Sequence, residues 1–515
     1  MSDHATSTAT LTPRAGRREW LGLAVLVLPT LLLALDMTVL HLAAPRLSAD
    51  LEPSSAELLW ILDIYGFMVA GFLITMGTLG DRIGRRRLLL IGACAFGLAS
   101  IAAAFANSAL MLIFTRALLG IAGATLMPST LALIRNLFHV EHERTLAITI
   151  WMTGFIVGSA IGPLVGGVML ELFWWGSVFL LAVPVMVLLL LVGPWLLPES
   201  RDSNAGKLDM ASALLCISAV LLLIFAIKDG ARDGINALAV VSLIAALVTG
   251  ALFVRRQRRL AEPMFDLTLF NKPSFSVSVA AMMLCILALS GSWLMIFQFL
   301  QGVSGLSALH AGLVMVPAAL LQTAASLLVP RLSRWLAPTK LISGGLVLAA
   351  GGLALMLLIH ADSNLALMVA ASVLLGVGIM PMMILGTDLV IGSAPPEKTG
   401  AAAATSETAT ELGMAMGIAV IGSVGATLYR SSMEQQLSGV LDRHQLAVAS
   451  DTIGGAMGVL SHLPQAQLEQ VHAAVNSSFT LALHANALIG VVIMLGAALL
   501  VALCLRQVPS VGGGH

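Results

Sequence analysis

Fourteen helix-length apolar segments, spread from residue 20 to residue 505, constrain this 515-residue chain more than any other feature. At ~1.5 Å of rise per residue, a helix of about 20 residues crosses the hydrocarbon core of a bilayer, which is roughly 30 Å thick. Only 10% of the residues are charged, whereas a soluble protein carries about 25%. The sequence therefore predicts an all-α, multi-pass membrane protein with fourteen transmembrane helices.

Charge and cysteine content exclude several function classes. The 27 basic and 27 acidic residues cancel, which argues against a nucleic-acid partner. Four cysteines stand singly in apolar runs, without the spacing of a metal site or a disulfide framework. We find no nucleophile–base pair and no phosphate-binding loop in the sequence, so we expect neither an enzyme nor a bound cofactor or metal.

The placement of lysine and arginine predicts the orientation. If the N-terminus is cytoplasmic, the loops and tails on that side hold about four times as many Lys and Arg residues as those on the other side. We therefore expect both termini in the cytoplasm. Residues 1–18, rich in Ser, Thr and Ala, are expected to form a disordered tail, and residues 506–515 a second tail.

A faint internal repeat divides the chain. The motif Gly80–Arg85, after the second segment, recurs in degraded form as Val329–Arg334 after the tenth. Such paired halves suggest two similar bundles with a substrate site between them. Counting back from the tenth segment predicts an N-terminal six-helix bundle in residues 19–200, two inserted helices in 201–260 and a C-terminal six-helix bundle in 261–505.

A long loop at about residues 430–480 separates the last two segments. It contains polar helical patterns at Met433–His444 and Gln465–Val475. We expect these patterns to form a small helical hairpin over the outer face, on the side of the membrane opposite the termini.

Acidic residues inside the apolar segments mark candidate functional sites. A carboxylate at the bilayer centre costs on the order of 2.5–3.5 kcal/mol, so Asp36 in the first segment is a functional candidate. In the second segment Asp63 follows Trp60 by about one helical turn and precedes Tyr65. An acid beside an aromatic face is a plausible cation site. The alternative is an interfacial Trp60 beside a water-exposed Asp63.

A second group of charges lies in later segments. Glu407 and Glu411 are four residues apart on one helix face, and like-charge repulsion with desolvation favours the protonated state of one of them. The alternative is a polar contact between helices. Arg116, inside the fourth segment, needs a partner, and a structural ion pair with a buried acid would provide one.

Two glycine-containing motifs complete the set. The loop Gly77-Thr78-Leu79-Gly80-Asp81-Arg82-Ile83-Gly84-Arg85-Arg86-Arg87 has glycines for a tight turn and an acid among arginines for a switchable charge network, unless it is an ordinary basic loop. In the fifth segment the series Gly154, Gly158, Gly162, Pro163, Gly166 and Gly167 lines one helix face. Such a stripe allows close backbone approach, although generic small-residue packing has the same pattern.

Together these motifs resemble a known family. The loop from Gly77 is similar to the signature loop of the major facilitator superfamily, which supports gating there, and the glycine series is similar to the antiporter motif of its proton-driven drug exporters. The stretch Leu35–Pro45 resembles the first-helix motif of the fourteen-helix branch, with His41 in place of the usual asparagine, as in some methyl-viologen-type members. The spacing of Glu407 and Glu411 matches quaternary-ammonium exporters.

The resemblance spans nearly the whole chain. It implies the major facilitator fold and a monomeric drug:proton antiporter in the bacterial inner membrane, exchanging lipophilic organic cations (quaternary ammonium biocides, dyes, methyl viologen) for protons. It implies proton-coupling and substrate-binding roles for Asp36, Asp63, Glu407, Glu411 and Arg116, a substrate cavity with His41, Trp60, Tyr65 and Trp151, and gating by Gly77, Gly80, Asp81, Arg82, Gly84, Arg85 and Arg86.

Two points stay open at the level of the sequence. His41 is either a titrating group or a hydrogen-bonding residue at the rim of the cavity. The direction of transport and the drug substrates rest on the resemblance alone, so a proton-coupled exporter of one dedicated endogenous metabolite is the alternative.

Overall fold

The computed structural model of the chain describes residues 14–201, 209–233, 236–260, 263, 267–360, 365–394 and 399–505. These residues are almost entirely helical, and the only β pairing among them is an isolated bridge between Ser438 and Leu441. In chain order the helices are α1 (Arg17–Leu51), α2 (Ser55–Ile83), α3 (Arg85–Ala104), α4 (Ala109–Leu137), α5 (Glu141–Leu172), α6 (Ser177–Leu180), α7 (Ala182–Leu196), α8 (Met210–Asp233), α9 (Ala237–Gln257), η1 (Leu269–Asn271), α10 (Pro273–Gln298), η2 (Phe299–Val303), α11 (Ala308–Leu332), α12 (Pro338–Met356), α13 (Leu365–Ser393), α14 (Thr399–Leu437), α15 (Arg443–Asp451), α16 (Ile453–Leu460) and α17 (Gln465–Cys504).

The helices account for the apolar segments of the sequence. Among the described residues, 13 helical spans are long and apolar enough to cross a membrane, with α6 and α7 together forming one of them. The remaining expected segment is α5, which is 32 residues long but contributes two shorter apolar stretches, Leu146–Phe155 and Ile161–Leu172. Helices are favoured because a bilayer offers no hydrogen-bond partners to the backbone. Residues 1–13 of the expected first tail and the whole of the expected second tail lie outside the described residues, and Arg17 and Arg18 already belong to α1.

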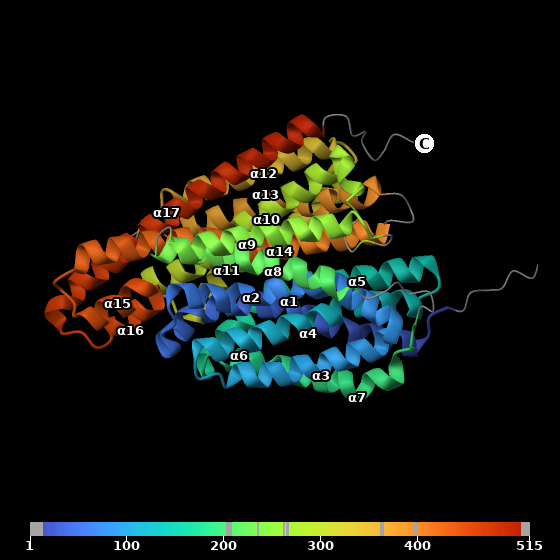
Figure 1. Cartoon of the computed structure of the whole chain (residues 1–515), viewed down its shortest axis with the longest axis horizontal. Coiled ribbons are helices and arrows are strands. Elements are labelled where there is room, and N and C mark those ends of the chain that lie inside the picture. Colours follow the sequence, from blue (N-terminus) through green and yellow to red (C-terminus); the bar gives the residue numbers. More distant parts are fainter. Residues whose placement is uncertain are drawn as a thin grey trace, which may run out of the picture.

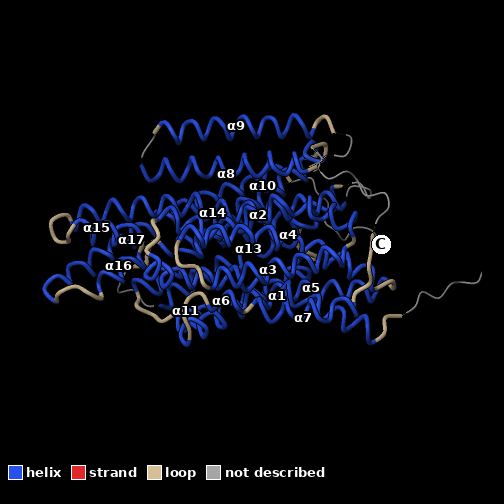
Figure 2. The backbone as a smooth tube through the Cα atoms, turned by 60° about the horizontal axis from the view of Figure 1, so that its bottom comes forward, coloured by secondary structure: helices blue, strands red, loops and turns tan. Residues whose placement is uncertain are grey.

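The chain forms two groups of helices. Figure 1 shows α1–α7, coloured blue to green, on one side, and α12, α13 and α17 on the other, with α10 and α14 beside them. Helix α11 belongs to the second group, and the groups meet where α2 packs against α14 and α5 against α11, with further contacts between α1 and α10. In Figure 2 helix α9 is the outermost layer and α8 lies between it and the other helices. Helix α8 packs against both α2 and α14, so it covers the line along which the two groups meet.

Local sequence signals set several helix ends. Helix α2 begins with a capping box, in which the Ser54 hydroxyl accepts from the backbone N–H of Glu57 at 3.3 Å and the Glu57 carboxylate accepts from the N–H of Ser54 at 3.0 Å. Gly84 ends α2 and precedes α3 with φ 112°, in the region that favours glycine. The predicted tight turn of this loop is therefore present.

The long loop between the last two segments differs from the expected hairpin. Of the residues expected to form its two helices, 433–437 instead extend α14, which ends at Leu437, and 465–475 belong to α17, which begins at Gln465. The chain reverses at Gly439, where φ is 89°. A hairpin is formed by α15 and α16, and α15 starts where the Asp442 carboxylate accepts from the N–H of Gln445 at 2.8 Å. We call the end of the molecule that carries α15 and α16 the hairpin end.

Candidate functional site

The acid of the first segment is paired with the arginine of the fourth. The Arg116 Nη1 of α4 lies 2.7 Å from the Asp36 Oδ2 of α1. The Arg116 side chain is 1% exposed and that of Asp36 is 13% exposed. An arginine and a carboxylate at this depth are stable only together, since removal of either leaves an uncompensated buried charge. The need of Arg116 for a partner is thus met by Asp36.

Arg116 also connects further elements. Its Nε donates to the backbone carbonyl of Ile61 in α2 at 3.3 Å, and its guanidinium lies 4.7 Å from the centroid of the Tyr65 ring. Tyr65 interacts electrostatically with Asp36 and with Glu411, so acids of α1 and α14 lie near the same phenol. Four of the predicted site residues therefore lie close together: Asp36, Tyr65, Arg116 and Glu411.

The acid of the second segment is also paired, with a residue that sequence reasoning did not single out. Asp63 Oδ2 lies 2.8 Å from the Nζ of Lys228 in α8, and the two side chains are 0% and 2% exposed. The Lys228 ammonium lies 4.1 Å from the centroid of the Trp60 ring. The expected arrangement of an acid beside an aromatic face is present, and a cation of the chain occupies it. The alternative of a water-exposed Asp63 is wrong.

Within the two inserted helices expected in 201–260, we expect the first to span about residues 208–228. Lys228 was not singled out because it ends this apolar segment, where a lysine is usually part of a loop. One signal was available. On the orientation that we predict, Lys228 lies on the side of the membrane whose loops are poor in lysine and arginine. A basic residue on that side, attached to an apolar helix, has no role in setting the topology.

The two glutamates of α14 have no such partner. Glu411 is 4% exposed, and its Oε2 is buried without a hydrogen-bond partner among the described residues. Glu407 is half-buried one turn earlier, and neither glutamate takes part in an ion pair within the described part of the chain. At Gly66 of α2 the absent side chain leaves room for Ala415 and Glu411, which places Glu411 at the contact between the two helix groups.

The remaining predicted cavity residues also bury polar atoms. His41 on α1 and Trp151 on α5 are half-buried, and the His41 Nδ1 and the Trp151 Nε1 have no hydrogen-bond partner among the described residues. Buried polar atoms of this kind are usually satisfied by ordered water or by a ligand. His41 was expected to form hydrogen bonds at the rim of the cavity, but its Nδ1 forms none with the described residues.

The glycine series of α5 packs against α1. A methyl group at Gly154 would lie 2.7 Å from the Val27 Cγ1, and one at Gly158 would collide with the Leu31 carbonyl. Gly162 and Gly166 meet Thr38 and Val39 in the same way. The last glycine, Gly167, contacts Leu309 of α11, and Pro163 of α5 contacts Gly312 of α11 through its carbonyl. The predicted close approach of backbones is present, and it spans both helix groups.

The loop after α2 contains the predicted charge network. Arg85 Nη2 lies 2.6 Å from Asp81 Oδ1. The network includes one acid that sequence reasoning missed, Glu199, which accepts from the backbone N–H of Arg86 at 3.1 Å and lies 3.6 Å from its Nε. Arg86 Nη1 also donates to the Leu197 carbonyl at 3.0 Å. The loop is therefore fastened to the segment that follows α7, which an ordinary basic loop would not require.

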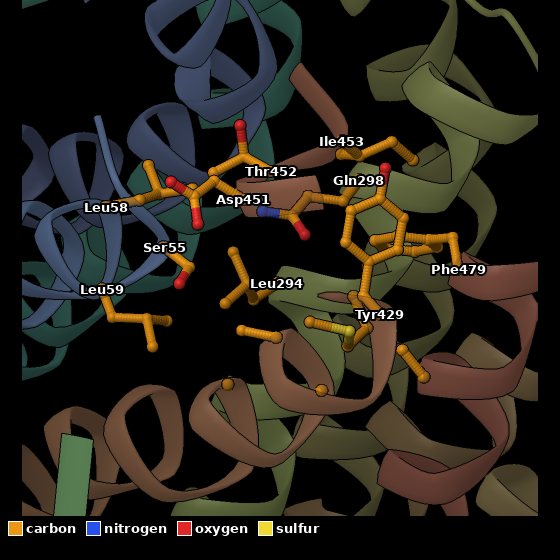
Figure 3. Close-up of a pocket in the computed structure, with 15 residues that line it drawn as sticks. Ser55, Leu58, Leu59, Leu294, Gln298, Tyr429, Asp451, Thr452, Ile453 and Phe479 are labelled. Atoms are coloured by element: carbon orange, nitrogen blue, oxygen red, sulfur yellow. The ribbon is translucent and has the colours of Figure 1, made fainter. Parts of the chain in front are cut away.

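At the hairpin end the two helix groups are held together. Arg430 of α14 pairs with Asp451 of α15 and donates to the Ser55 hydroxyl of α2 at 2.7 Å. A cavity of about 40 Å³ lies beside these residues, with Ser55 and Asp451 on one side and Tyr429 and Phe479 on the other (Figure 3). Sites for small organic ligands measure roughly 300–1,000 Å³, so this cavity is large enough only for water.

Comparison with known proteins supports the family suggested by the sequence. The model of the Major Facilitator Superfamily matches residues 26–418. The multidrug efflux pump LfrA of Mycolicibacterium smegmatis is 44% identical over 96% of this chain and 98% of its own length. The methyl viologen resistance protein SmvA of Salmonella typhimurium is 37% identical over 90% of this chain and 93% of its own.

Solved structures show the same fold. A bacterial homolog of the human lysosomal transporter Spinster, in an inward-facing and occupied conformation, superposes with a TM-score of 0.65. It is 17% identical and covers 96% of this chain and 98% of its own. The chain therefore belongs to the Major Facilitator Superfamily, a family of membrane transporters and not of enzymes.

Proposed function

We propose that this protein exports lipophilic organic cations across the bacterial inner membrane in exchange for protons. The names of the relatives support export of toxic compounds, since one is a multidrug efflux pump and another confers methyl viologen resistance. Methyl viologen is itself an organic cation. The buried acids of α1, α2 and α14 supply groups that can bind either a proton or an organic cation.

The observation that carries the proposal is the unpaired Glu411. A buried carboxylate without a counter-ion is destabilised by desolvation, and it becomes stable when it binds a proton or a cation. Glu411 lies where the two helix groups meet, near Tyr65 and one turn from Glu407. Such a group binds a proton when no cation is present and releases it when a cation approaches, which is the exchange that antiport requires.

The other predicted residues support this cycle. Protons from the outside load one or more of Asp36, Asp63, Glu407 and Glu411, and cation binding from the inside releases them. Each proton that enters contributes about 2.3 kcal/mol per 100 mV of membrane potential. Apolar and aromatic walls that include His41, Trp60, Tyr65 and Trp151 would accept many organic cations with little directional specificity.

Alternating access would arise from movement of one bundle against the other. We propose bundles at residues 19–200 and 261–505, with 201–260 inserted between them and both termini in the cytoplasm of a monomer. The loop from Gly77 to Arg86 then lies on the cytoplasmic side and fastens or releases that end. The contacts of α5 with α11, at Gly167 and Pro163, and the Arg430–Asp451 pair belong to the opposite end.

Transport by the purified protein in liposomes tests this function. Ethidium movement is followed by fluorescence with and without an imposed pH gradient. Accumulation in acid-inside vesicles that collapses with an uncoupler is the expected result. Absence of any pH-dependent movement of ethidium or methyl viologen, by protein that unfolds cooperatively on heating, would contradict the proposal.

A transporter with one dedicated substrate is the second candidate. One relative, 30% identical over 91% of this chain, is a tetracenomycin C resistance and export protein of Streptomyces glaucescens, so single compounds are named among the relatives. A panel of dyes, quaternary ammonium compounds and neutral antibiotics separates the two functions. Broad cation transport favours the multidrug proposal, and response to a single compound favours the dedicated exporter.

A further inference from the structure

We propose that Lys228 is an internal cation which occupies the organic-cation subsite formed by Asp63 and Trp60, and which the transported cation must displace. The inference rests on the proposed export of organic cations and assigns a role to the inserted helix α8. Lys228 would then set the affinity of the subsite and select substrates that can compete with an ammonium group.

The two contacts of Lys228 are those that recognise organic cations. Its Nζ lies 2.8 Å from a carboxylate oxygen of Asp63 and 4.1 Å from the centre of the Trp60 ring. A carboxylate together with an aromatic face is the usual means of binding a cation in an apolar site. A quaternary or planar aromatic cation would meet the same two groups in the same place.

The Asp63–Lys228 pair lacks the additional hydrogen bonds that a purely structural buried ion pair needs. Buried ion pairs offset their desolvation only when further hydrogen bonds satisfy the remaining donors and acceptors. Here no side chain among the described residues other than Asp63 accepts from the Nζ of Lys228, and no basic side chain among them other than Lys228 pairs with Asp63. An ammonium with three donors and no second acceptor is held less firmly than its burial suggests, so a competing cation can replace it.

The surroundings of the pair are apolar and adaptable. Lys228 is in the last two turns of α8, next to a cluster in which Phe67 of α2, Ile224 of α8 and Ala415 of α14 are buried. A lipophilic cation would gain contacts with these side chains that the slender lysine chain does not fill. The four-carbon stem of lysine lets its ammonium withdraw along the helix toward the membrane surface while the stem stays on apolar side chains.

The position of α8 connects displacement to the rest of the molecule. Helix α8 touches α2 in one helix group and α14 in the other, and its ion pair is its buried charged link to α2. Release of Lys228 therefore loosens α8 from the line where the groups meet. Substrate binding would thus weaken one contact that holds the groups in this arrangement.

Equilibrium binding of ethidium to the purified protein tests the inference. We compare the wild-type protein with Lys228→Gln, Asp63→Asn and the double variant, and use Lys272→Gln as a matched control. Lys272 is a lysine outside the site whose Nζ donates to the Ser393 carbonyl at 2.7 Å. Removal of the internal competitor should lower the Kd of Lys228→Gln by about tenfold, the factor that ~1.4 kcal/mol gives. The double variant should lose this gain, and Lys272→Gln should bind as the wild type does.

Failure of the inference and failure of the proposed function give different results in this experiment. Unchanged or weaker binding by a folded Lys228→Gln, with ethidium bound by the wild type, overturns the inference while the proposed function stands. No ethidium binding by the wild type overturns both.

A measurement on the unaltered chain covers the case in which Lys228→Gln does not fold. Acylation of Lys228 by a membrane-permeant amine reagent, followed by mass spectrometry, should rise severalfold when ethidium is added and should not rise at Lys272. Equal protection of Lys228 with and without saturating ethidium would overturn the inference.

Discussion

The acids of the two helix groups are treated differently. In the first group Asp36 is paired with Arg116 and Asp63 with Lys228, so each carboxylate has a basic side chain within 2.8 Å. In the second group Glu411 is buried to a similar degree and has no ion-pair partner among the described residues. Buried acids are therefore neutralised by basic side chains of the protein in the first helix group, whereas Glu411 in the second group has no such partner within the described part of the chain.

The difference indicates that the paired and the unpaired acids have different functions. A paired acid is stable in the folded protein without a ligand, and another cation can bind it only by displacing its partner. An unpaired acid has to bind something, and the smallest available cation is the proton. We infer that Glu411 is the main proton carrier and that the pairs of α1 and α2 respond to the larger substrate. Four predictions test this difference in function, in order of expected effect.

The largest effect is expected for Glu411→Gln. The amide cannot exchange a proton, so accumulation driven by a pH gradient should fall by at least about tenfold, the factor given by ~1.4 kcal/mol. Ethidium exchange without a gradient should persist, and thermal stability should not fall, because no charge is left unpaired. Liposome transport with and without a gradient measures both activities.

Glu434→Gln is the matched control for this variant. Glu434 is an exposed glutamate on the same helix, near the hairpin end. Gradient-driven transport should be as fast as in the wild type. If Glu411→Gln keeps its gradient-driven transport, Glu411 is not the main proton carrier, and Glu407, Asp36 or Asp63 has to carry the proton.

The second prediction concerns the pair in α1 and α4. Arg116→Leu leaves Asp36 as a buried unpaired charge and should lower stability by roughly 3–5 kcal/mol. The double variant Asp36→Asn with Arg116→Leu removes both charges and should recover most of this loss. Thermal unfolding in detergent measures the effect. An equal loss in the single and double variants would mean that the contacts of Arg116 with Ile61 and Tyr65, and not its charge pair, provide the stability.

The third prediction concerns the close packing of α5 against α1. Gly158→Ala places a methyl group against the Leu31 carbonyl of α1 and should lower stability by about 1–3 kcal/mol. Gly344→Ala in α12 is the control, since its methyl group would enter open space and should raise stability by about 0.5–1 kcal/mol. Unfolding of both variants decides whether the glycine series serves close packing or only flexibility. Equal, small effects would contradict the packing role.

The sequence was sufficient to predict those structural features that depend on residues close together in the chain. The apolar segments predicted the helices, the glycines of α5 predicted its close packing, and the acid among arginines in the loop from Gly77 predicted a charge network there, because each pattern lies within one helix or one turn. The turn at Gly84 is local in the same sense.

Partners from distant segments could not be predicted. Asp36 and Arg116 are 80 positions apart, and their pairing depends on how α1 packs against α4. Lys228 reaches Asp63 only because the inserted helix α8 returns to α2, and no spacing in the sequence encodes that return. The hairpin was misplaced for a related reason. The pattern at Gln465–Val475 is helical as predicted, and that at Met433–His444 only in part, since residues 438–442 are not helical. A pattern does not show whether a helix is separate or continues its neighbour.

The last and smallest effect is expected at the loop after α2, where an acid is paired but partly exposed to solvent. Glu199 contacts the backbone N–H of Arg86 and lies within 4 Å of the side chains of Arg86 and Arg87, and its own side chain is 24% exposed. Solvent screens such a pair, so Glu199→Gln should change stability by less than about 1 kcal/mol, and the difference should shrink further at high salt. Thermal unfolding at low and high NaCl concentration measures it. A loss as large as that of Arg116→Leu would show that pairing, and not burial, determines how much an acid matters in this protein, and the contrast between α14 and the first helix group would then need another cause.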